Sequence, residues 1–380
     1  MNKLDLDAIR TRINTIDAQL AQLFEERMQV VAQVAAYKKE HNLPIRDSKR
    51  EQEVLEQAGD RMQDTALRVA WQRIMRQIIE TAVANEHSLM SAEETQNKAA
   101  QANQTAPQTG VVAYQGVPGA YSHLALEQHF GSQQKCVAYA VFEDVVRAVK
   151  DGAVSYGVLP IENSSTGGIT EVYDLVRRYD VSIVGEEIVK VEHNLLAYPG
   201  TKLEEVREVY SHPQGFAQCR SFFKKYPLMK QIPYFNTAKG AEYVAEHHTN
   251  YMAAVAGRQA AERYGLAILA AHINSNANNY TRFIIIGSQA EFDAAADKIT
   301  LVVSLRHEPG SLYKLLGYFE EEGLNLANIE SRPLEGRSWE YFFHLDVKGN
   351  LQDVLVQKAL RQVEDNTIEC KILGNYRSAQ

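Results

Sequence analysis

The chain opens with a long helical pattern of apolar positions. Over Ile9–Tyr37, alternating steps of four and three residues meet an apolar or aromatic side chain at every step but one, and the first proline is Pro44. This spacing predicts a single amphipathic helix over residues 4–40, roughly 50 Å long. Shorter helices are expected at Ser48–Ala58 and Thr65–His87. Because so little other material can cover the long helix, we expect an intertwined all-α dimer.

One charged residue, Arg27, interrupts the apolar seam of the long helix. A guanidinium within an apolar seam costs several kcal/mol unless an anion meets it. That anion is either a carboxylate of the protein or a carboxylate of a ligand. Lys38 lies about three turns further along, on nearly the same face of the helix. The pattern therefore predicts that two cations share one pocket.

The pattern changes after residue 92. Residues 93–109 are polar and rich in Gln, Ala and Thr, which is typical of a linker. Strand and helix patterns then alternate over residues 110–288, which indicates an α/β domain. Over residues 297–376 the order strand, helix, strand, strand, helix, strand predicts an α+β ferredoxin-like domain. With the helical segment 1–92, we expect three domains.

Composition excludes several classes of function. The net charge of −8 argues against nonspecific nucleic-acid binding. No stretch reaches the ~18 apolar residues of a membrane span, and the acidic, amphipathic N-terminus does not resemble a signal peptide, so we expect a cytoplasmic protein. Cys136, Cys219 and Cys370 are too far apart for a metal site. We expect neither a metal nor a cofactor.

Charged residues near the long helix form the first candidate site. The motif RDSKRE follows directly after Pro44. Taken alone, these charges are equally typical of the solvated rim of a coiled coil. With Arg27 in the seam, they resemble the chorismate mutase family of the AroQ type, over residues 4–90. The residues that carry the resemblance are Arg10, Arg27, Lys38, Asp47, Arg50 and Glu51.

The resemblance implies a role for each of these residues. Arginines that match Arg27, Arg10 of the partner subunit and, less directly, Arg50 meet the two carboxylates of the ligand. The lysine that matches Lys38 binds the ether oxygen, and the two acidic residues of RDSKRE bind around the hydroxyl group. The reaction, chorismate to prephenate, is a pericyclic rearrangement. Catalysis therefore rests on positioning and on stabilising a developing negative ether oxygen.

The third predicted helix departs from the family pattern. Enteric bifunctional members of the family carry a Ser and a Gln where this chain has Ala82 and Glu86. A neutral amide donates a hydrogen bond to the ether oxygen, whereas a glutamate does so only when protonated. We therefore expect mutase activity to fall as pH rises. If Glu86 is instead ionised, it is the anion that satisfies Arg27, and the mutase half is weak. A surface position near the helix end is the third interpretation of Glu86.

Four short motifs mark a second candidate site. GVPGAYS joins a strand to a helix, and PIENS, SHPQGFAQC and TRF each lie at a strand end, where α/β folds build their sites. Each motif alone is more typical of a structural turn. Occurring in order, they resemble the prephenate dehydratase family over residues 110–288, whose fold is two α/β subdomains around a cleft, like a periplasmic binding protein. The matching site residues are Glu162, Asn163, Ser164, Ser211, Gln218, Thr281 and Arg282.

The chemistry of this family accounts for the residue types. Prephenate loses carbon dioxide and its ring hydroxyl together, and aromatisation of the ring drives the reaction. The enzyme therefore has to hold two carboxylates and assist hydroxide as it leaves. The resemblance assigns catalysis to Thr281, whose hydroxyl can donate a hydrogen bond to the leaving oxygen. Glu162 is expected to be the ultimate source of the proton.

The C-terminal segment resembles an ACT domain, the amino-acid-sensing module of many biosynthetic enzymes. Of its two family motifs, the second is intact as ESRP, and the first ends in Tyr313 where the family has Val. The resemblance implies that phenylalanine binds here and inhibits the enzyme. A dimerisation module without a ligand is the alternative. The expected effector-binding residues are Gly310, Ser311, Leu312, Glu330, Ser331, Arg332 and Pro333.

Together the resemblances imply a bifunctional enzyme of phenylalanine biosynthesis, active as a homodimer or higher oligomer. It would convert chorismate to prephenate and prephenate to phenylpyruvate. A second interpretation keeps the dehydratase but reduces the helical half to a dimerisation arm. A third, from a different class, is a small-molecule receptor, because the central fold is receptor-like. The missing signal peptide and the pairing of Thr281 with Glu162 argue against a receptor.

Overall fold

The computed structural model describes residues 5–41, 43, 47–91, 110–334 and 341–379. The chain divides into two units, Met1–Gln101 and Ala102–Gln380, and each is described by itself. The expected linker, residues 93–109, lies outside the described residues. Within the described residues, no helix is long and apolar enough to cross a membrane.

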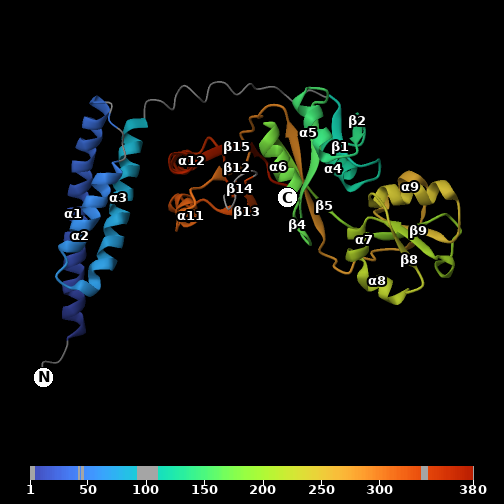
Figure 1. The fold of residues 1–380 in the computed structure, drawn as a ribbon, viewed down its shortest axis with the longest axis horizontal. Coiled ribbons are helices and arrows are strands. Elements are labelled where there is room, and N and C mark those ends of the chain that lie inside the picture. Colours follow the sequence, from blue (N-terminus) through green and yellow to red (C-terminus); the bar gives the residue numbers. More distant parts are fainter. Residues whose placement is uncertain (1–4, 42, 44–46, 92–109, 335–340, 380) are drawn as a thin grey trace. The chain divides into compact units, whose positions relative to one another are not determined.

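The first unit is helical, as the apolar pattern predicts (Figure 1). The side chains of Asp5 and Asp47 cap two of the helices by accepting hydrogen bonds from backbone N–H groups of the first turn. A short 3₁₀ turn precedes the last helix. The elements are α1 (Leu6–Glu40), α2 (Ser48–Asp60), η1 (Thr65–Leu67) and α3 (Arg68–Ser91).

The apolar seam of α1 lies on the surface of this protomer. Its exposed fractions include 40% at Ile9, 52% at Leu20 and 61% at Leu23. Elsewhere α1 packs on α3, and Ala35 is a buried residue of α1. A long apolar stripe that stays exposed is the pattern of a helix that packs against a further chain.

The second unit begins with a lobe built on a six-stranded sheet, here called lobe 1. The strand order is β2-β1-β3-β11-β5, with β4 paired to β3. Strands β1, β2 and β3 are parallel, whereas β11 is antiparallel to β3 and β5. The elements are β1 (Val112–Gln115), α4 (Tyr121–Phe130), β2 (Cys136–Tyr139), α5 (Phe142–Lys150), β3 (Tyr156–Asn163), β4 (Gly167–Gly168), α6 (Thr170–Tyr179), β5 (Ser182–Lys190) and β11 (Tyr280–Gly287).

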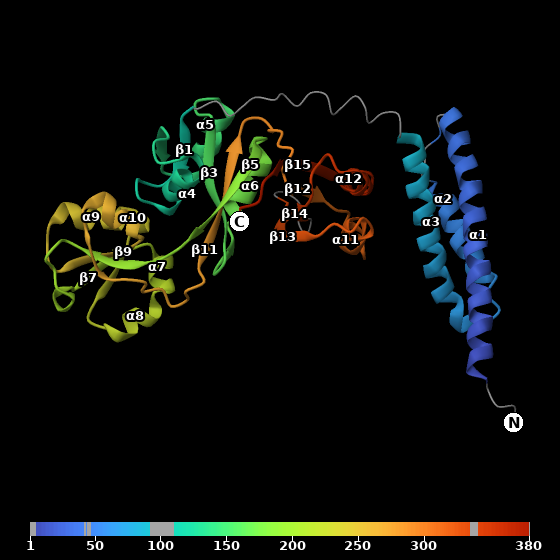
Figure 2. The ribbon, with the colours of Figure 1, turned by 180° about the vertical axis from the view of Figure 1, so that it is seen from behind.

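A second lobe, lobe 2, is inserted between β5 and β11 (Figure 2). Its five-stranded sheet has the order β10-β6-β9-β7-β8. The chain crosses between the lobes twice, so the ends of β3 and β11 lie at the junction. The elements are β6 (Asn194–Ala197), η3 (Leu203–Glu205), β7 (Glu208–Ser211), α7 (Pro213–Gln218), α8 (Arg220–Lys225), β8 (Lys230–Pro233), α9 (Thr237–His247), β9 (Met252–Ala256), α10 (Arg258–Tyr264) and β10 (Ala267–Ala270).

The C-terminal part has the strand and helix order that the sequence predicts. Its four strands are antiparallel, in the order β13-β14-β12-β15, which is the ferredoxin-like arrangement. Two helices pack on one face of the sheet around Phe319 and Leu345. The elements are β12 (Lys298–Ser304), α11 (Ser311–Glu321), β13 (Leu326–Pro333), β14 (Tyr341–Lys348), α12 (Val354–Asn366) and β15 (Glu369–Tyr376).

The other face of this sheet packs on lobe 1. Val302, Phe342 and Tyr376 share one apolar core with residues of lobe 1. At Gly374 of β15, a Cβ atom would overlap the carbonyl oxygen of Ile183 on β5. Only a residue without a side chain lets the two backbones approach this closely. The C-terminal domain is therefore seated directly on the lobe that carries β3 and β11.

Candidate active sites

Four residues predicted for the mutase site come together between α1 and α3. Arg27 donates a hydrogen bond to the carbonyl oxygen of Ile78 at 3.5 Å, and burial lowers the pKa of its guanidinium. Lys38 Nζ lies 2.7 Å from Glu86 Oε2, and Ala82, one turn before Glu86, is buried. The face of α3 that carries Ala82 and Glu86 is thus turned toward the cations of α1.

This geometry decides between the interpretations of Glu86. Its side chain is 8% exposed, so the surface interpretation is wrong. Its carboxylate pairs with Lys38, and no described carboxylate pairs with Arg27. The interpretation in which Glu86 neutralises the seam arginine is therefore also wrong. An anion for Arg27 is therefore sought outside the described side chains of this protomer.

The other residues predicted for the mutase site lie nearer the surface. Arg10 has a side chain that is 67% exposed, and its ion-pair partner is an Asp one turn earlier on α1. Asp47 caps α2, and Arg50 pairs with a Glu of the same helix at 3.3 Å. Glu51 is half-buried. The structure of one protomer does not bring Arg10 to the residues between α1 and α3.

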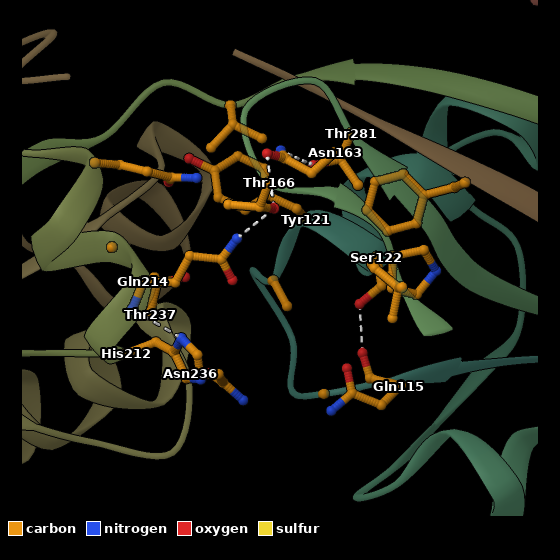
Figure 3. A pocket seen from close by; sticks show the side chains of 18 of the residues that line it. Gln115, Tyr121, Ser122, Asn163, Thr166, His212, Gln214, Asn236, Thr237 and Thr281 are labelled. Atoms are coloured by element: carbon orange, nitrogen blue, oxygen red, sulfur yellow. Dashed lines mark hydrogen bonds between the residues drawn. The ribbon is translucent and has the colours of Figure 1, made fainter. Parts of the chain in front are cut away.

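A cavity of about 290 Å³ lies between the two lobes of the second unit (Figure 3). Lobe 1 contributes the first turn of α4, β4 and the paired ends of β3 and β11, and lobe 2 contributes the first turns of α7 and α9. A volume of this order suits a small organic ligand. The polar lining residues are Gln115, Tyr121, Ser122, Asn163, Thr166, His193, His212, Gln214, Gln218, Asn236, Thr237 and Thr281.

Thr281 and Asn163 form a pair in the wall of the cavity. They are neighbours in the register of β11 and β3, and Figure 3 shows their side chains together. Thr281 Oγ1 accepts a hydrogen bond from Asn163 Nδ2 at 2.9 Å. Asn163 is itself held, because its Nδ2 also donates to Asn279 Oδ1 at 2.9 Å. The hydroxyl hydrogen of Thr281 is therefore left for a ligand.

A second polar chain joins Tyr121, His193 and Gln218. His193 is 2% exposed, and its Nε2 lies 2.8 Å from Gln218 Oε1. The Tyr121 hydroxyl donates to the carbonyl oxygen of Glu192 at 2.9 Å and lies 3.4 Å from His193 Nδ1. Burial lowers the pKa of His193, so the ring is neutral and donates through Nε2. This hydrogen bond orients the amide of Gln218, so its amino group can donate to a ligand in the cavity.

Three helix N-termini border the cavity. The first turns of α4, α7 and α9 all contribute lining residues. The N-cap of α4, Ala120, has no side-chain hydrogen bond to the first amides of the helix. Such N–H groups carry partial positive charge and bind carboxylates. Since no Lys or Arg is among the described lining residues, neutral donors and helix N-termini are what the cavity offers an anion.

Several lining residues were not predicted from the sequence. Gln214 of lobe 2 donates to Thr166 of lobe 1 at 3.0 Å, and this bond crosses the cavity. Gln214 and Tyr121 belong to the motifs SHPQGFAQC and GVPGAYS, so the motifs marked the right segments but not these side chains. Asn236 is an N-cap, which a capping pattern can indicate. His193 follows β5 without any motif signal.

Glu162 and Arg282 lie on the opposite face of the sheet from the cavity. Side chains alternate along a strand, so the neighbours of Asn163 and Thr281 point away from the lining. The guanidinium of Arg282 lies 3.2 Å from Glu162 and 2.7 Å from Asp346 of the C-terminal domain. The prediction that these two residues contact the substrate is corrected accordingly. Glu162 is not placed to protonate a ligand in the cavity.

Ser164 and Ser211 also support the scaffold instead of lining the cavity. Ser211 is fully buried, and its hydroxyl donates to the carbonyl oxygen of Val255 at 2.7 Å. Ser164 Oγ accepts a hydrogen bond from the backbone N–H of Tyr280 at 2.9 Å. Both hydroxyls tie neighbouring segments together, and their predicted substrate contact is corrected. Of the seven predicted residues, Asn163, Gln218 and Thr281 line the cavity.

The first group of predicted effector residues lies at the start of α11. Gly310 has φ 85°, and the helix begins after it without a side-chain cap. Ser311 is half-buried and Leu312 is exposed. An uncapped helix start that follows a left-handed glycine leaves N–H groups accessible to a carboxylate.

The second group, the ESRP segment of β13, is divided between two faces. Ser331 and Pro333 are exposed, whereas Glu330 and Arg332 are half-buried. The guanidinium of Arg332 binds both carboxylate oxygens of Asp174 on α6, at 3.3 and 2.8 Å. A Cβ atom on Gly168, which lines the cavity, would lie 3.3 Å from the carboxylate of Glu330. Two of the predicted effector residues thus contact the lobe that carries the cavity.

Family models match three successive parts of the chain. Residues 9–87 match the model described as chorismate mutase type II. Residues 112–291 match prephenate dehydratase, and residues 299–365 match the ACT domain. These ranges contain, respectively, the contact between α1 and α3, the cavity between the lobes and most of the C-terminal sheet, all but β15 and the first residue of β12.

Individual proteins match as well. A prephenate dehydratase from Arthrobacter aurescens, solved in complex with L-Phe, is 30% identical with a TM-score of 0.65, covering 70% of this chain and 90% of that one. The structure of GqqA, described as a novel type of quorum quenching acylase, is 32% identical with a TM-score of 0.65, covering 70% and 98%. A bifunctional chorismate mutase/prephenate dehydratase from Enterobacter agglomerans is 33% identical over 380 residues, covering 98% of this chain and 95% of the relative. The chain therefore belongs to the family of bifunctional chorismate mutase/prephenate dehydratases.

Proposed function

We propose that the helical unit converts chorismate to prephenate and that the cavity between the lobes converts prephenate to phenylpyruvate. The observation that carries the second activity is the pair of Thr281 and Asn163. It presents a hydroxyl hydrogen to a cavity that is rich in neutral donors and helix N-termini. That combination suits a dicarboxylate that has to lose a hydroxide ion.

In the dehydratase step, the bond from the ring to its carboxylate breaks, and its electrons enter the ring. The bond from the ring to the hydroxyl oxygen breaks at the opposite carbon, and the oxygen takes a proton and leaves as water. We assign the donation of that proton to the Thr281 hydroxyl, which is then restored from solvent. A threonine hydroxyl is a weak acid. The hydrogen bond from Asn163 Nδ2 to Oγ1 stabilises the negative charge that develops there.

In the mutase step, the α1 cations hold the ligand and no proton is transferred. Arg27 meets a ligand carboxylate, and Lys38 and a protonated Glu86 donate to the ether oxygen. Lys38 is bound to Glu86 before the ligand arrives, at 2.7 Å. Substrate therefore has to exchange that ion pair for contacts of its own.

Two further properties are proposed for the assembly. The exposed seam of α1 packs against a second copy of the chain, and the partner's Arg10 then completes the mutase site. Phenylalanine binds the C-terminal domain and inhibits the dehydratase. The uncapped start of α11 and the L-Phe complex of the Arthrobacter aurescens relative support this regulation.

The test is a mass-balanced conversion of chorismate by the purified full-length chain. Chorismate loss, prephenate and phenylpyruvate are quantified by chromatography over time, with and without phenylalanine. We expect prephenate to appear first and phenylpyruvate to follow, with the second step slowed by phenylalanine. Loss of chorismate without phenylpyruvate would remove the dehydratase assignment. Conversion of added prephenate without loss of chorismate would reduce the helical unit to a dimerisation arm.

A further inference from the structure

A buried cluster of charges lies directly behind the Thr281 end of the cavity. The side chain of Arg282 is 12% exposed, and its guanidinium lies 3.3 Å from Glu186 and 2.7 Å from Asp346. Glu162 on the neighbouring strand is a third partner, at 3.2 Å. Burial opposes the charged form of Arg282, but Asp346 and the other nearby groups outweigh it and raise the pKa of the guanidinium. The cluster therefore contains a permanent cation held by three carboxylates.

The C-terminal domain supplies part of this cluster. Asp346 stands on β14 and is 4% exposed. Thr300 Oγ1 donates to Asp346 Oδ1 at 2.7 Å and lies 2.8 Å from the hydroxyl oxygen of Tyr376. Lys298, from the same domain, pairs with Glu186 of lobe 1. The orientation of the Asp346 carboxylate is thus determined from both sides.

The charge cluster and the cavity are connected by two consecutive residues of β11. Arg282 and Thr281 are consecutive on β11, one on each face of the sheet. The register of β11 against β3 shifts just after Arg282. At such a shift the ladder constrains the strand less, and side-chain contacts have more influence on its position. Removing Asp346 takes away one of the three carboxylates that hold Arg282, and the strand can then shift toward the remaining two.

We propose that Asp346 is a positioning residue for the dehydratase reaction. Through Arg282, this carboxylate of the C-terminal domain holds the hydroxyl of Thr281 in place within the cavity. The inference rests on the dehydratase activity proposed above. It makes the C-terminal domain a part of the active-site scaffold even when no effector is bound.

The test compares variants of the full-length chain with prephenate as substrate. Asp346→Ala is expected to lower the dehydratase kcat at least about tenfold, because displacing a reacting group by ~1 Å costs on the order of a hundredfold. The KM for prephenate should stay within about threefold, since Asp346 touches no lining group. Asp346→Asn keeps an oxygen for Arg282 and a polar group for Thr300, so it should recover most of kcat. The mutase rate of the same preparations serves as the reference for the amount of protein.

Glu369→Gln is the matched control. Glu369 of β15 pairs with Arg177 of α6 at 3.2 Å, so the change breaks another ion pair between the same two domains, away from β11. It should leave kcat unchanged. A merely structural role of Asp346 would lower thermal stability, and the loss of dehydratase rate would follow the unfolded fraction measured by circular dichroism.

A second variant covers the case in which Asp346→Ala does not fold. Arg282→Lys keeps the charge but loses the planar fork that links three carboxylates, and the same loss confined to kcat is expected. If Asp346→Ala or Arg282→Lys folds and its kcat stays within about twofold of the unchanged chain, the role of Asp346 is overturned and the proposed function still stands. An unchanged chain that lacks dehydratase activity overturns the proposed function, and this inference with it.

Discussion

The direction of one hydrogen atom determines what Thr281 can do. A hydroxyl has one hydrogen and two lone pairs. At Thr281 one lone pair is occupied by Asn163 Nδ2, at 2.9 Å, so the hydrogen is directed elsewhere. Glu162 is next to Asn163 in sequence but contacts Arg282 on the other face of the sheet. At the residue scale, the proposed catalysis therefore depends on which face of β3 and β11 a side chain occupies.

Substitutions at the two faces should have different effects on the dehydratase. Thr281→Val keeps the shape but removes the hydroxyl, and kcat should fall by ~10²–10³, the usual effect of losing one catalytic hydrogen-bond donor. Thr281→Ser should keep most of the activity. Glu162→Gln should cost less than about tenfold, because the carboxylate does not line the cavity. Phenylpyruvate formation from prephenate measures all three. An inactive Glu162→Gln beside an active Thr281→Val would restore Glu162 as the proton source.

Glu86→Gln should raise the mutase rate. The carboxyl group donates to the ether oxygen only as the neutral acid, whereas the amide of Glu86→Gln always donates and forms no ion pair with Lys38. We therefore expect kcat/KM for chorismate to rise, which chorismate disappearance measures. A weak rate in the unchanged chain, together with an inactive Glu86→Gln, would indicate a degenerate mutase half.

At the scale of elements, the apolar seam of α1 is exposed, whereas the side of β14 that faces lobe 1 is buried. The seam of α1 is exposed in the protomer, with Leu20 52% exposed, and needs apolar cover. The lobe-facing side of β14 is already covered, and it buries His344 against Tyr173 and Phe342. Each element can therefore be tested by introducing a charge. A carboxylate in the seam should prevent packing of two chains, and protonation of the buried His344 ring should lower stability.

A charge in the seam should dissociate the proposed dimer. Leu20→Asp places a carboxylate where two α1 helices are proposed to pack, so we expect a monomer by sedimentation velocity and a loss of mutase activity. Dehydratase activity should persist, because its cavity lies within one chain. Gln22→Asp, at an exposed polar position of the same helix, adds the same charge and should leave the dimer intact. A dimeric, active Leu20→Asp would exclude the seam as the interface.

His344 should make the second unit sensitive to acid. Burial lowers its pKa to about 4 from the usual 6.5, and Nε2 has no hydrogen-bond partner among the described residues. Because the folded state holds the ring neutral, stability is unaffected above pH ~6.5 and falls as pH drops toward 4, by roughly 3 kcal/mol at most. His344→Phe should remove this loss. Urea unfolding at pH 7.5 and pH 5 measures it, and an equal decline in both proteins would contradict the prediction.

At the scale of the whole molecule, contacts between domains were the part that sequence could not predict. Helix periodicity and strand order predicted the elements of all three segments, and the motifs predicted the segments around the cavity. Motifs do not show which way a side chain points, so Glu162, Arg282, Ser164 and Ser211 were assigned to the wrong surface. The contact of Asp346 with Arg282 joins distant parts of the chain and depends on docking of one sheet onto another. No local pattern records such docking.

The contact between Arg332 and Asp174 should oppose the effector. Arg332 belongs to the predicted effector motif but is bound to α6 of lobe 1. Asp174→Asn weakens that contact and frees Arg332, so half-inhibition by phenylalanine should occur at a several-fold lower concentration. The uninhibited kcat should be unchanged. Asp144→Asn on α5, at another partly exposed carboxylate of the same lobe, is the control. An unchanged response to phenylalanine would show that Arg332 takes no part in regulation.

The cavity without a lysine or arginine in its described lining has a consequence for turnover. Prephenate carries two carboxylates and phenylpyruvate one, so the reaction itself removes a negative charge from the site. Each contact to a carboxylate then comes from a helix N-terminus, which contributes ~0.3–1 kcal/mol, or from a neutral donor, whose hydrogen bond to a charged group contributes roughly 1.5–3 kcal/mol. Loss of one carboxylate removes the contacts made to it, so the cavity should bind the monoanion more weakly than the dianion. The chemical step itself therefore favours release of the product.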